Sequence, residues 1–176
     1  MTIHSSDPFA TPEGGKSRVR RLRGRLPSAV TLWTAKDSTG SRAGLTVSST
    51  VVVDGDPGRV LGVLDEEAAL WEVVQRTRRF TVAPLTDADR QLADKFAGLL
   101  PAPGGAFAAA QWRETDFGPV LTTATTWAGC RLDDSRPMGW GLLIEATIEH
   151  VEIGAEGDAP SLIHYQGRYG TVLRHP

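Results

Sequence analysis

Short apolar and β-branched runs, separated by clusters of Gly, Asp, Ser and Pro, are the feature that most constrains the fold of this chain. Examples are Ala29–Ala35, Leu45–Asp54, Arg79–Leu85 and Leu142–Ile153. Runs of this kind are typical of β-strands, and the turn residues between them favour antiparallel connections. About six such strands, each with one half-buried face, close most economically into a small barrel. We therefore expect a mainly β, antiparallel fold.

Two stretches change from the strand period to the helical period. In Glu66–Thr77 the apolar residues recur at helical spacing, and Asp65 stands where an N-cap residue belongs. A second helix is expected at Asp87–Ala97, where Thr86 is followed three residues later by Asp89, the pattern of a capping box. The sequence therefore predicts two short helices among the strands.

The size and the cysteine content bound the class of protein. A chain of 176 residues corresponds to one domain. Its apolar runs are far shorter than the roughly 20 residues that a membrane helix needs, and its start lacks the pattern of a secretory signal. Cys130 is the only cysteine, so no internal disulfide and no cysteine-based metal site can form. We expect a cytoplasmic protein with no membrane contact.

Basic residues gather near the N-terminus. Residues 1–26 carry six basic side chains against Asp7 and Glu13, a net charge of +4, which leaves −6 of the total −2 for the rest. The segment has no apolar period, so we expect residues 1–24 to be a flexible basic tail and residues 25–176 to form the domain. The alternative is an arm that binds nucleic acid, which the lack of a second basic patch disfavours.

General catalytic motifs are missing from the sequence. No group of His, Cys, Asp and Glu has the spacing of metal ligands, and the four histidines are scattered. The chain also lacks a nucleophile elbow, a phosphate-binding loop and a dinucleotide-binding glycine pattern. We therefore predict no metal site, and the sequence names no catalytic residue.

One strand carries a cluster of small hydroxyl residues beside a glycine. In Gly44–Ser49, the alternation of a strand places Thr46 and Ser48 on one face and Val47 and Ser49 on the other. A glycine beside small hydroxyl groups lets a flat ligand approach the backbone and hydrogen-bond to it. The alternative is an ordinary edge strand rich in Ser and Thr, so the pattern alone leaves both interpretations open.

Five segments together resemble one known family. These segments are LPSAVTLWT at 26–34, GLTVSS at 44–49, RFTVAPL at 79–85, LADKFAG at 92–98 and HYQGRY at 164–169. In their order and spacing they resemble the flavin reductase-like family, whose members are FMN-binding split barrels. The resemblance covers residues 26–173 and implies a six-stranded antiparallel split β-barrel with two short helices.

The resemblance implies a homodimer that binds flavin in a cleft between its subunits. It assigns contacts with the flavin to a set of residues from four segments: Thr31, Thr46, Val47, Ser48, Ser49, Ala83, Leu85, Lys95 and Phe96. The implied activity is NAD(P)H-dependent reduction of FMN, with FAD as an alternative flavin. The reduced flavin would then supply a partner monooxygenase.

Three positions depart from the pattern of this family. Acidic residues at 65–67 stand where the flavin phosphate docks, with Arg78 or Arg79 as candidates to compensate their charge. Ala83 replaces an Asn, and Gly139–Trp140–Gly141 replaces a Gly-Asp-His segment whose His lies near the nicotinamide. These differences favour an alternative of another class, a flavin-binding dimer without reductase turnover.

Overall fold

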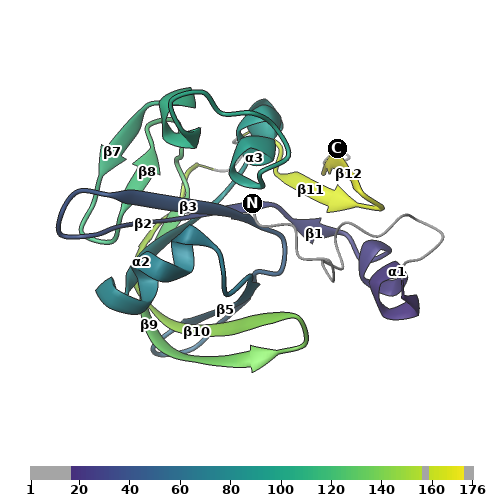
Figure 1. Ribbon diagram of the computed structural model, residues 1–176, viewed down its shortest axis with the longest axis horizontal. Coiled ribbons are helices and arrows are strands. Elements are labelled where there is room, and N and C mark those ends of the chain that lie inside the picture. Colours follow the sequence, from purple (N-terminus) through teal and green to yellow (C-terminus); the bar gives the residue numbers. More distant parts are fainter. Residues whose placement is uncertain (1–16, 156–158, 173–176) are drawn as a thin grey trace.

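The largest unit of the fold is a curved antiparallel sheet with the strand order β3-β2-β6-β9-β10-β5-β4 (Figure 1). The computed structural model describes residues 17–155 and 159–172. The strands of this sheet are β2 (Thr31–Lys36), β3 (Arg42–Val47), β4 (Val51–Val53), β5 (Arg59–Leu64), β6 (Arg79–Pro84), β9 (Trp127–Met138) and β10 (Gly141–Glu152). The expectation of a mainly β, antiparallel fold is confirmed, although the strands are more numerous and shorter than the expected six.

Two small sheets complete the β structure. The first joins β1 (Ser28–Ala29), β11 (Leu162–Tyr165) and β12 (Arg168–Thr171), and the second joins β7 (Trp112–Glu114) and β8 (Pro119–Leu121). The run expected as one strand at Val120–Leu132 is therefore divided between β8 and β9. The run expected at Leu162–Leu173 is a hairpin, which turns at Gln166 and Gly167, both with positive φ.

The expected strand Leu45–Asp54 is broken at residues 48–50, because the chain changes partners there. Strand β3 pairs with β2 up to Val47, whereas β4 pairs with β5 from Val51 onward. Strands β3 and β4 are the two ends of the large sheet, so this short connection also bridges its open side. The hydroxyl cluster predicted from the sequence lies at this break.

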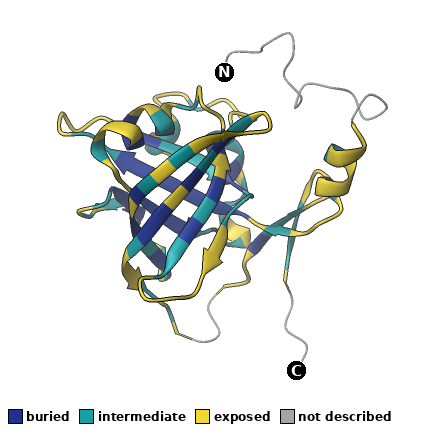
Figure 2. Ribbon diagram, turned by 90° about the horizontal axis from the view of Figure 1, so that it is seen from below, coloured by how far each residue is buried: buried dark blue, intermediate teal, exposed yellow. Residues whose placement is uncertain are grey.

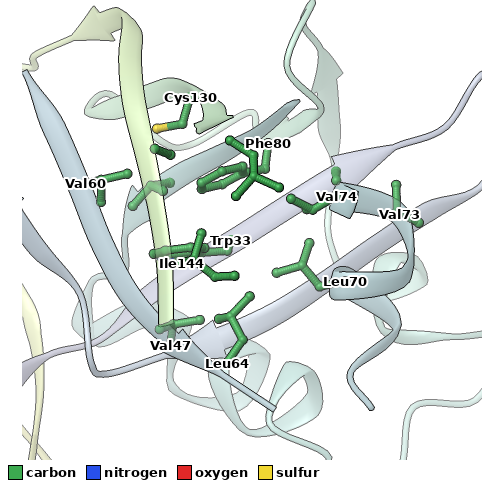
Figure 3. Close-up of a cluster of buried hydrophobic side chains, with 14 of the residues drawn as sticks. Trp33, Val47, Val60, Leu64, Leu70, Val73, Val74, Phe80, Cys130 and Ile144 are labelled. Atoms are coloured by element: carbon green, nitrogen blue, oxygen red, sulfur yellow. The ribbon is translucent and has the colours of Figure 1, made fainter. Parts of the chain in front are cut away.

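The core fills the inside of the curved sheet (Figures 2 and 3). Trp33 and Phe80 are fully buried and stack with their ring centroids 4.9 Å apart. A Cβ on Gly62 would lie 2.6 Å from the Trp33 ring, so the glycine is needed to admit the indole. In β5 the buried Val60, Gly62 and Leu64 alternate with more exposed residues, as the period of two requires, whereas β2 is buried along almost its whole length.

Both predicted helices are present. Helix α2 (Ala69–Thr77) begins three residues after the expected start, and its buried face of Leu70, Val73 and Val74 packs on β2 and β3. Asp65 is not its N-cap: the carboxylate accepts a hydrogen bond of 3.0 Å from the Glu67 N–H in the turn before the helix.

The second helix confirms the predicted capping pattern. It consists of a 3₁₀ turn, η2 (Asp87–Asp89), that continues into α3 (Arg90–Phe96). Asp89 Oδ2 accepts hydrogen bonds from the Thr86 N–H at 2.8 Å and from the Thr86 hydroxyl at 2.7 Å. Helix α3 buries Leu92, Ala93 and Phe96, which fixes it against the end of the barrel.

Part of the segment expected to be an irregular tail is helical. Helix α1 (Arg18–Gly24) begins at Ser17, whose hydroxyl accepts a hydrogen bond of 3.1 Å from the Arg20 N–H. No residue of α1 is buried, and the helix stands away from the barrel (Figure 2). Residues 1–16 of the predicted tail lie outside the described residues.

Candidate functional site

The candidate site is the break between β3 and β4, together with the strand ends around it. Val47 pairs with Thr31 of β2, and Thr31 pairs with Pro84 of β6, so the fold brings three of the predicted segments to one end of the barrel. Leu85 donates its N–H to the Val30 carbonyl at 2.9 Å and so continues the same end. The segments that the sequence assigned to one site are therefore neighbours.

Most of the predicted hydroxyls are already bound within the chain. The buried Thr31 hydroxyl donates to the Val47 carbonyl at 2.8 Å and accepts from the Trp33 indole N–H at 3.0 Å. The Thr46 hydroxyl donates to the Ala93 carbonyl of α3 at 2.8 Å. These groups hold the barrel end together, which leaves little capacity for a ligand.

Ser49 closes the barrel. Its hydroxyl donates to the Val63 carbonyl and accepts from the Val63 N–H, both at 2.9 Å. A side chain therefore makes the pair of hydrogen bonds that a neighbouring strand would make. Both bonds hold the end of β3 against β5. The Ser49 side chain therefore has a structural role, and its hydroxyl is not free.

Ser48 differs from its neighbours. Within the described residues, it is the one predicted site hydroxyl that makes no hydrogen bond to another residue, and it is half-buried. It lies directly after β3, between the buried Val47 and Ser49, whose hydroxyl is bound to Val63. The structure therefore presents one fixed and uncommitted hydroxyl at the barrel end, which is what a polar ligand atom requires.

Besides Thr31, four of the predicted contacts are buried, and these four are apolar side chains. Val47, Ala83, Leu85 and Phe96 are between 1% and 6% exposed. Their side chains belong to the hydrophobic clusters of the interior, and they are not available at the surface of one subunit. At Gly44 an added Cβ would lie 2.6 Å from Phe96, so the flat group that lies against this glycine within the chain is the Phe96 ring.

Lys95 lies apart from the hydroxyl group. On α3, the group that meets the Thr46 hydroxyl is the backbone carbonyl of Ala93. Lys95 instead lines a cavity of about 390 Å³ between α3, the segment that precedes β7 and the end of β8. The structure therefore does not bring Lys95 together with Thr46 and Ser48.

The expected compensation of the acidic stretch fails. Arg78 donates to the Leu132 and Asp133 carbonyls at 2.9 Å, and Arg79 pairs with Glu149 at 3.5 Å. Both arginines lie at the start of β6, whereas the site lies at its end. Asp65, Glu66 and Glu67 are exposed just after β5.

The hairpin between β9 and β10 contributes features that the sequence analysis did not assign. Trp140 at its tip is 80% exposed, and the pairing of Leu142 with Leu64 places this tip beside the acidic stretch. A Cβ on Gly141 would lie 2.5 Å from the Leu64 carbonyl oxygen. The backbone therefore admits no side chain at the position where the resemblance would place a histidine.

Apolar side chains are exposed along the strands next to the site. Val51 and Val53 on β4 and Val63 on β5 are 37% to 53% exposed and share the outward face of these strands. Apolar surface beside a polar hydroxyl suits a flat, partly polar ligand or a second protein surface. The sequence did not predict this exposed face, because a run of valines in a strand is equally typical of a buried core.

Two further findings concern metal binding and membrane spans. Among residues 17–155 and 159–172, no cluster of three or more His, Cys, Asp and Glu side chains could hold a metal ion. In the same described part of the chain, no helix is long and apolar enough to cross a membrane.

Comparison with known proteins identifies the family of the chain. The family described as flavin reductase like domain matches residues 23–173. An FMN reductase (NADH), RutF 2, from Methylorubrum extorquens strain PA1 is 32% identical over 173 residues, which cover 98% of this chain and 96% of that protein.

Solved structures share the fold. Nitrilotriacetate monooxygenase component B from Mycobacterium thermoresistibile superposes with a TM-score of 0.79 at 22% identity, covering 90% of this chain and 88% of the other. The styrene monooxygenase flavin reductase from Pseudomonas putida S12 superposes with a TM-score of 0.77 at 18% identity, covering 91% and 100%. The split-barrel fold and the family match agree, and the chain belongs to the flavin reductase like domain family.

Proposed function

We propose that this protein is an NADH:flavin oxidoreductase that binds FMN at the end of the barrel and reduces it. The observation that carries the proposal is the uncommitted Ser48 hydroxyl, held in place by neighbours whose own hydroxyls are bound to the chain. The near full-length similarity to an FMN reductase (NADH) supports the same substrates. Flavin supplies the redox chemistry, since its ring accepts hydride from the nicotinamide.

The residues of this chain would bind and orient the flavin. Ser48 would hydrogen-bond a polar atom of the flavin, while the side chains of Thr31, Thr46 and Ser49 keep the shelf rigid. Val47, Ala83, Leu85 and Phe96 would support the site from beneath. A rigid shelf needs little reorganisation on binding, which favours a well-defined position for the ring.

The wider setting of the activity follows from the relatives. We propose that reduced flavin is released to a partner monooxygenase, since two structural neighbours are a nitrilotriacetate monooxygenase component B and a styrene monooxygenase flavin reductase. We expect a homodimer, since Val51, Val53 and Val63 leave an apolar sheet face exposed on one subunit. A buried, single cysteine is consistent with the cytoplasm.

One observation favours the second candidate function, a flavin-binding dimer without turnover. Gly141 leaves no space for a side chain near Leu64, so the hairpin cannot offer an imidazole there. An assay of NADH oxidation with added FMN separates the two functions. Steady oxidation that depends on FMN supports the reductase; flavin binding without NADH oxidation supports the second candidate, and the absence of flavin binding overturns both.

The assay also resolves substrate choice. Parallel measurements with NADPH and with FAD establish which nucleotide and which flavin give the higher kcat/KM. The Ser48→Ala variant tests the site. The matched control is Gly24→Ala, because an added Cβ at Gly24 meets no atom within 4 Å.

A further inference from the structure

Helix α1 carries two exposed stripes of opposite character. Arg18, Arg21 and Arg25 are spaced by three and four residues and so share one face of the helical path. Val19, Leu22 and Leu26 repeat the same spacing one position along and are 76%, 61% and 59% exposed. An arginine stripe therefore runs directly beside an apolar stripe, and neither is covered by the barrel.

The arm that carries this helix is fixed to the domain at its base. Gln166 donates its N–H to the Gly24 carbonyl at 2.7 Å, and Ser28 pairs with His164 across β1 and β11. Beyond this base, α1 projects away from the barrel (Figure 2). A helix held in this way presents its two stripes to a partner rather than to its own domain.

A matching surface exists elsewhere on the same chain. Asp65, Glu66 and Glu67 form an exposed acidic stretch, with Val63 37% exposed just before it. Trp140 lies beside this stretch, because Leu142 pairs with Leu64, and it is 80% exposed. This surface therefore also places charge next to apolar area, with the opposite sign of charge to α1.

We propose that α1 of one protomer docks on the 65–67 surface of a second copy, and that the second copy returns the same contact. The three arginines would face the three carboxylates, while the apolar stripe would cover Val63 and Trp140. A reciprocal contact of this kind closes a two-fold dimer. The inference rests on the homodimer in the proposed function and specifies where its subunits meet.

The position of both surfaces favours a second copy over another partner. The arm leaves the barrel at Val30, whose carbonyl accepts a hydrogen bond from Leu85. The acidic stretch follows β5, in which Val63 is hydrogen-bonded to Ser49. Both surfaces therefore flank the same end of the barrel as Ser48. A two-fold axis near this end would place the arm of each subunit across the site of the other.

This arrangement has a consequence for flavin binding. The acidic stretch alone would repel a flavin phosphate, and the arginines of the same subunit at the start of β6 are bound elsewhere. Arginines delivered by the partner would offset the negative charge of residues 65–67 and so reduce its repulsion of the phosphate. Flavin affinity would then depend on dimer formation.

A charge-exchange experiment tests the contact by sedimentation velocity on the full chain without flavin. One variant carries Arg18→Glu, Arg21→Glu and Arg25→Glu, and a second carries Glu66→Lys and Glu67→Lys. Each alone should raise the dimer dissociation constant by about tenfold or more, since like charges then face each other. An equal mixture should restore a heterodimer, because both of its contacts regain opposite charges.

The control exchanges two exposed acids outside this surface, Asp116→Lys and Asp134→Lys, which should leave the dissociation constant unchanged. Restored dimer in the mixture, and weakening of the wild-type dimer by salt, are the expected results. Dimerisation unaffected by the arm variant, or a mixture that stays monomeric, would overturn the inference. The inference would also be overturned if the arm variant kept the wild-type dissociation constant while the unchanged arm bound duplex DNA in a salt-sensitive manner.

The outcome is independent of turnover, because no substrate is present. A dimer that follows the charge exchange but never oxidises NADH would retain this contact and reject the reductase. A reductase whose dimer ignores the exchange would do the reverse. Circular dichroism of each variant verifies that the barrel is folded.

Discussion

The hydroxyl of Ser49 holds the backbone of Val63 at both its N–H and its carbonyl, each at 2.9 Å. This contact links the segment that follows β3, at one edge of the large sheet, to β5, the strand next to the other edge. The adjacent Ser48 hydroxyl makes no hydrogen bond to another residue of the described chain. The two neighbouring serines therefore differ: the Ser49 hydroxyl is bound to Val63, whereas the Ser48 hydroxyl is the one that we propose for the ligand.

Removing the Ser49 hydroxyl should destabilise the fold. Ser49→Ala leaves the Val63 N–H and carbonyl without their partner, at a cost of about 1–2 kcal/mol. Urea unfolding followed by tryptophan fluorescence measures the change. A stability equal to that of the wild type would contradict the closing function of Ser49.

Removing the Ser48 hydroxyl should act on the ligand instead. Ser48→Ala is expected to leave the unfolding free energy unchanged and to weaken FMN binding about fivefold, equivalent to about 1 kcal/mol. Titration of the protein into FMN, followed by flavin fluorescence, gives the dissociation constant. Equal flavin affinity in Ser48→Ala and wild type would remove Ser48 from the site.

A side chain at Gly141 should be tolerated poorly. The Cβ of Gly141→Ala would lie 2.5 Å from the Leu64 carbonyl oxygen, so the β5–β10 pairing must shift, at about 1–3 kcal/mol. Gly141→His should lose at least as much and gain no turnover. Thermal unfolding measures the loss, and Gly24→Ala provides the control with open space at its Cβ.

The thiol of Cys130 should be inert in the folded protein. Burial, and next the Glu149 carboxylate, raise the pKa of this thiol to about 12. Because the thiolate is the reactive form, a thiol reagent at about pH 8 should label the native chain very slowly and the unfolded chain rapidly. Rapid labelling under native conditions would show that β9 opens readily.

Acid should weaken the base of the arm through His164. Burial, and next the charge of Arg23, lower the pKa of this imidazole below its usual 6.5. The unfolded chain then binds the proton more readily, so stability is full above about pH 6.5 and falls as the pH drops toward the lower folded pKa. His164→Gln should flatten the dependence of Tm between about pH 7.5 and pH 5. A wild-type Tm that does not respond to pH in this range would contradict the assignment.

Local features of the fold were accessible from the sequence. The Thr86 and Asp89 pair predicted a helix start and makes the expected hydrogen bonds, because a capping box involves residues three positions apart. The strand runs and their turns predicted an antiparallel barrel, since the period of two and the turn residues act over a few neighbours. Segment order and spacing were enough to indicate the family.

Only the tertiary structure decided which hydroxyl is free. Thr31, Thr46 and Ser49 find their partners at Val47, Ala93 and Val63, which are 14 to 47 residues away in the chain. A periodic pattern gives the face of a strand on which a hydroxyl lies, but not the carbonyl that comes to meet it. The same limit hid the close approach of Phe96 to Gly44 and of Leu64 to Gly141, because these distances depend on how separate elements pack.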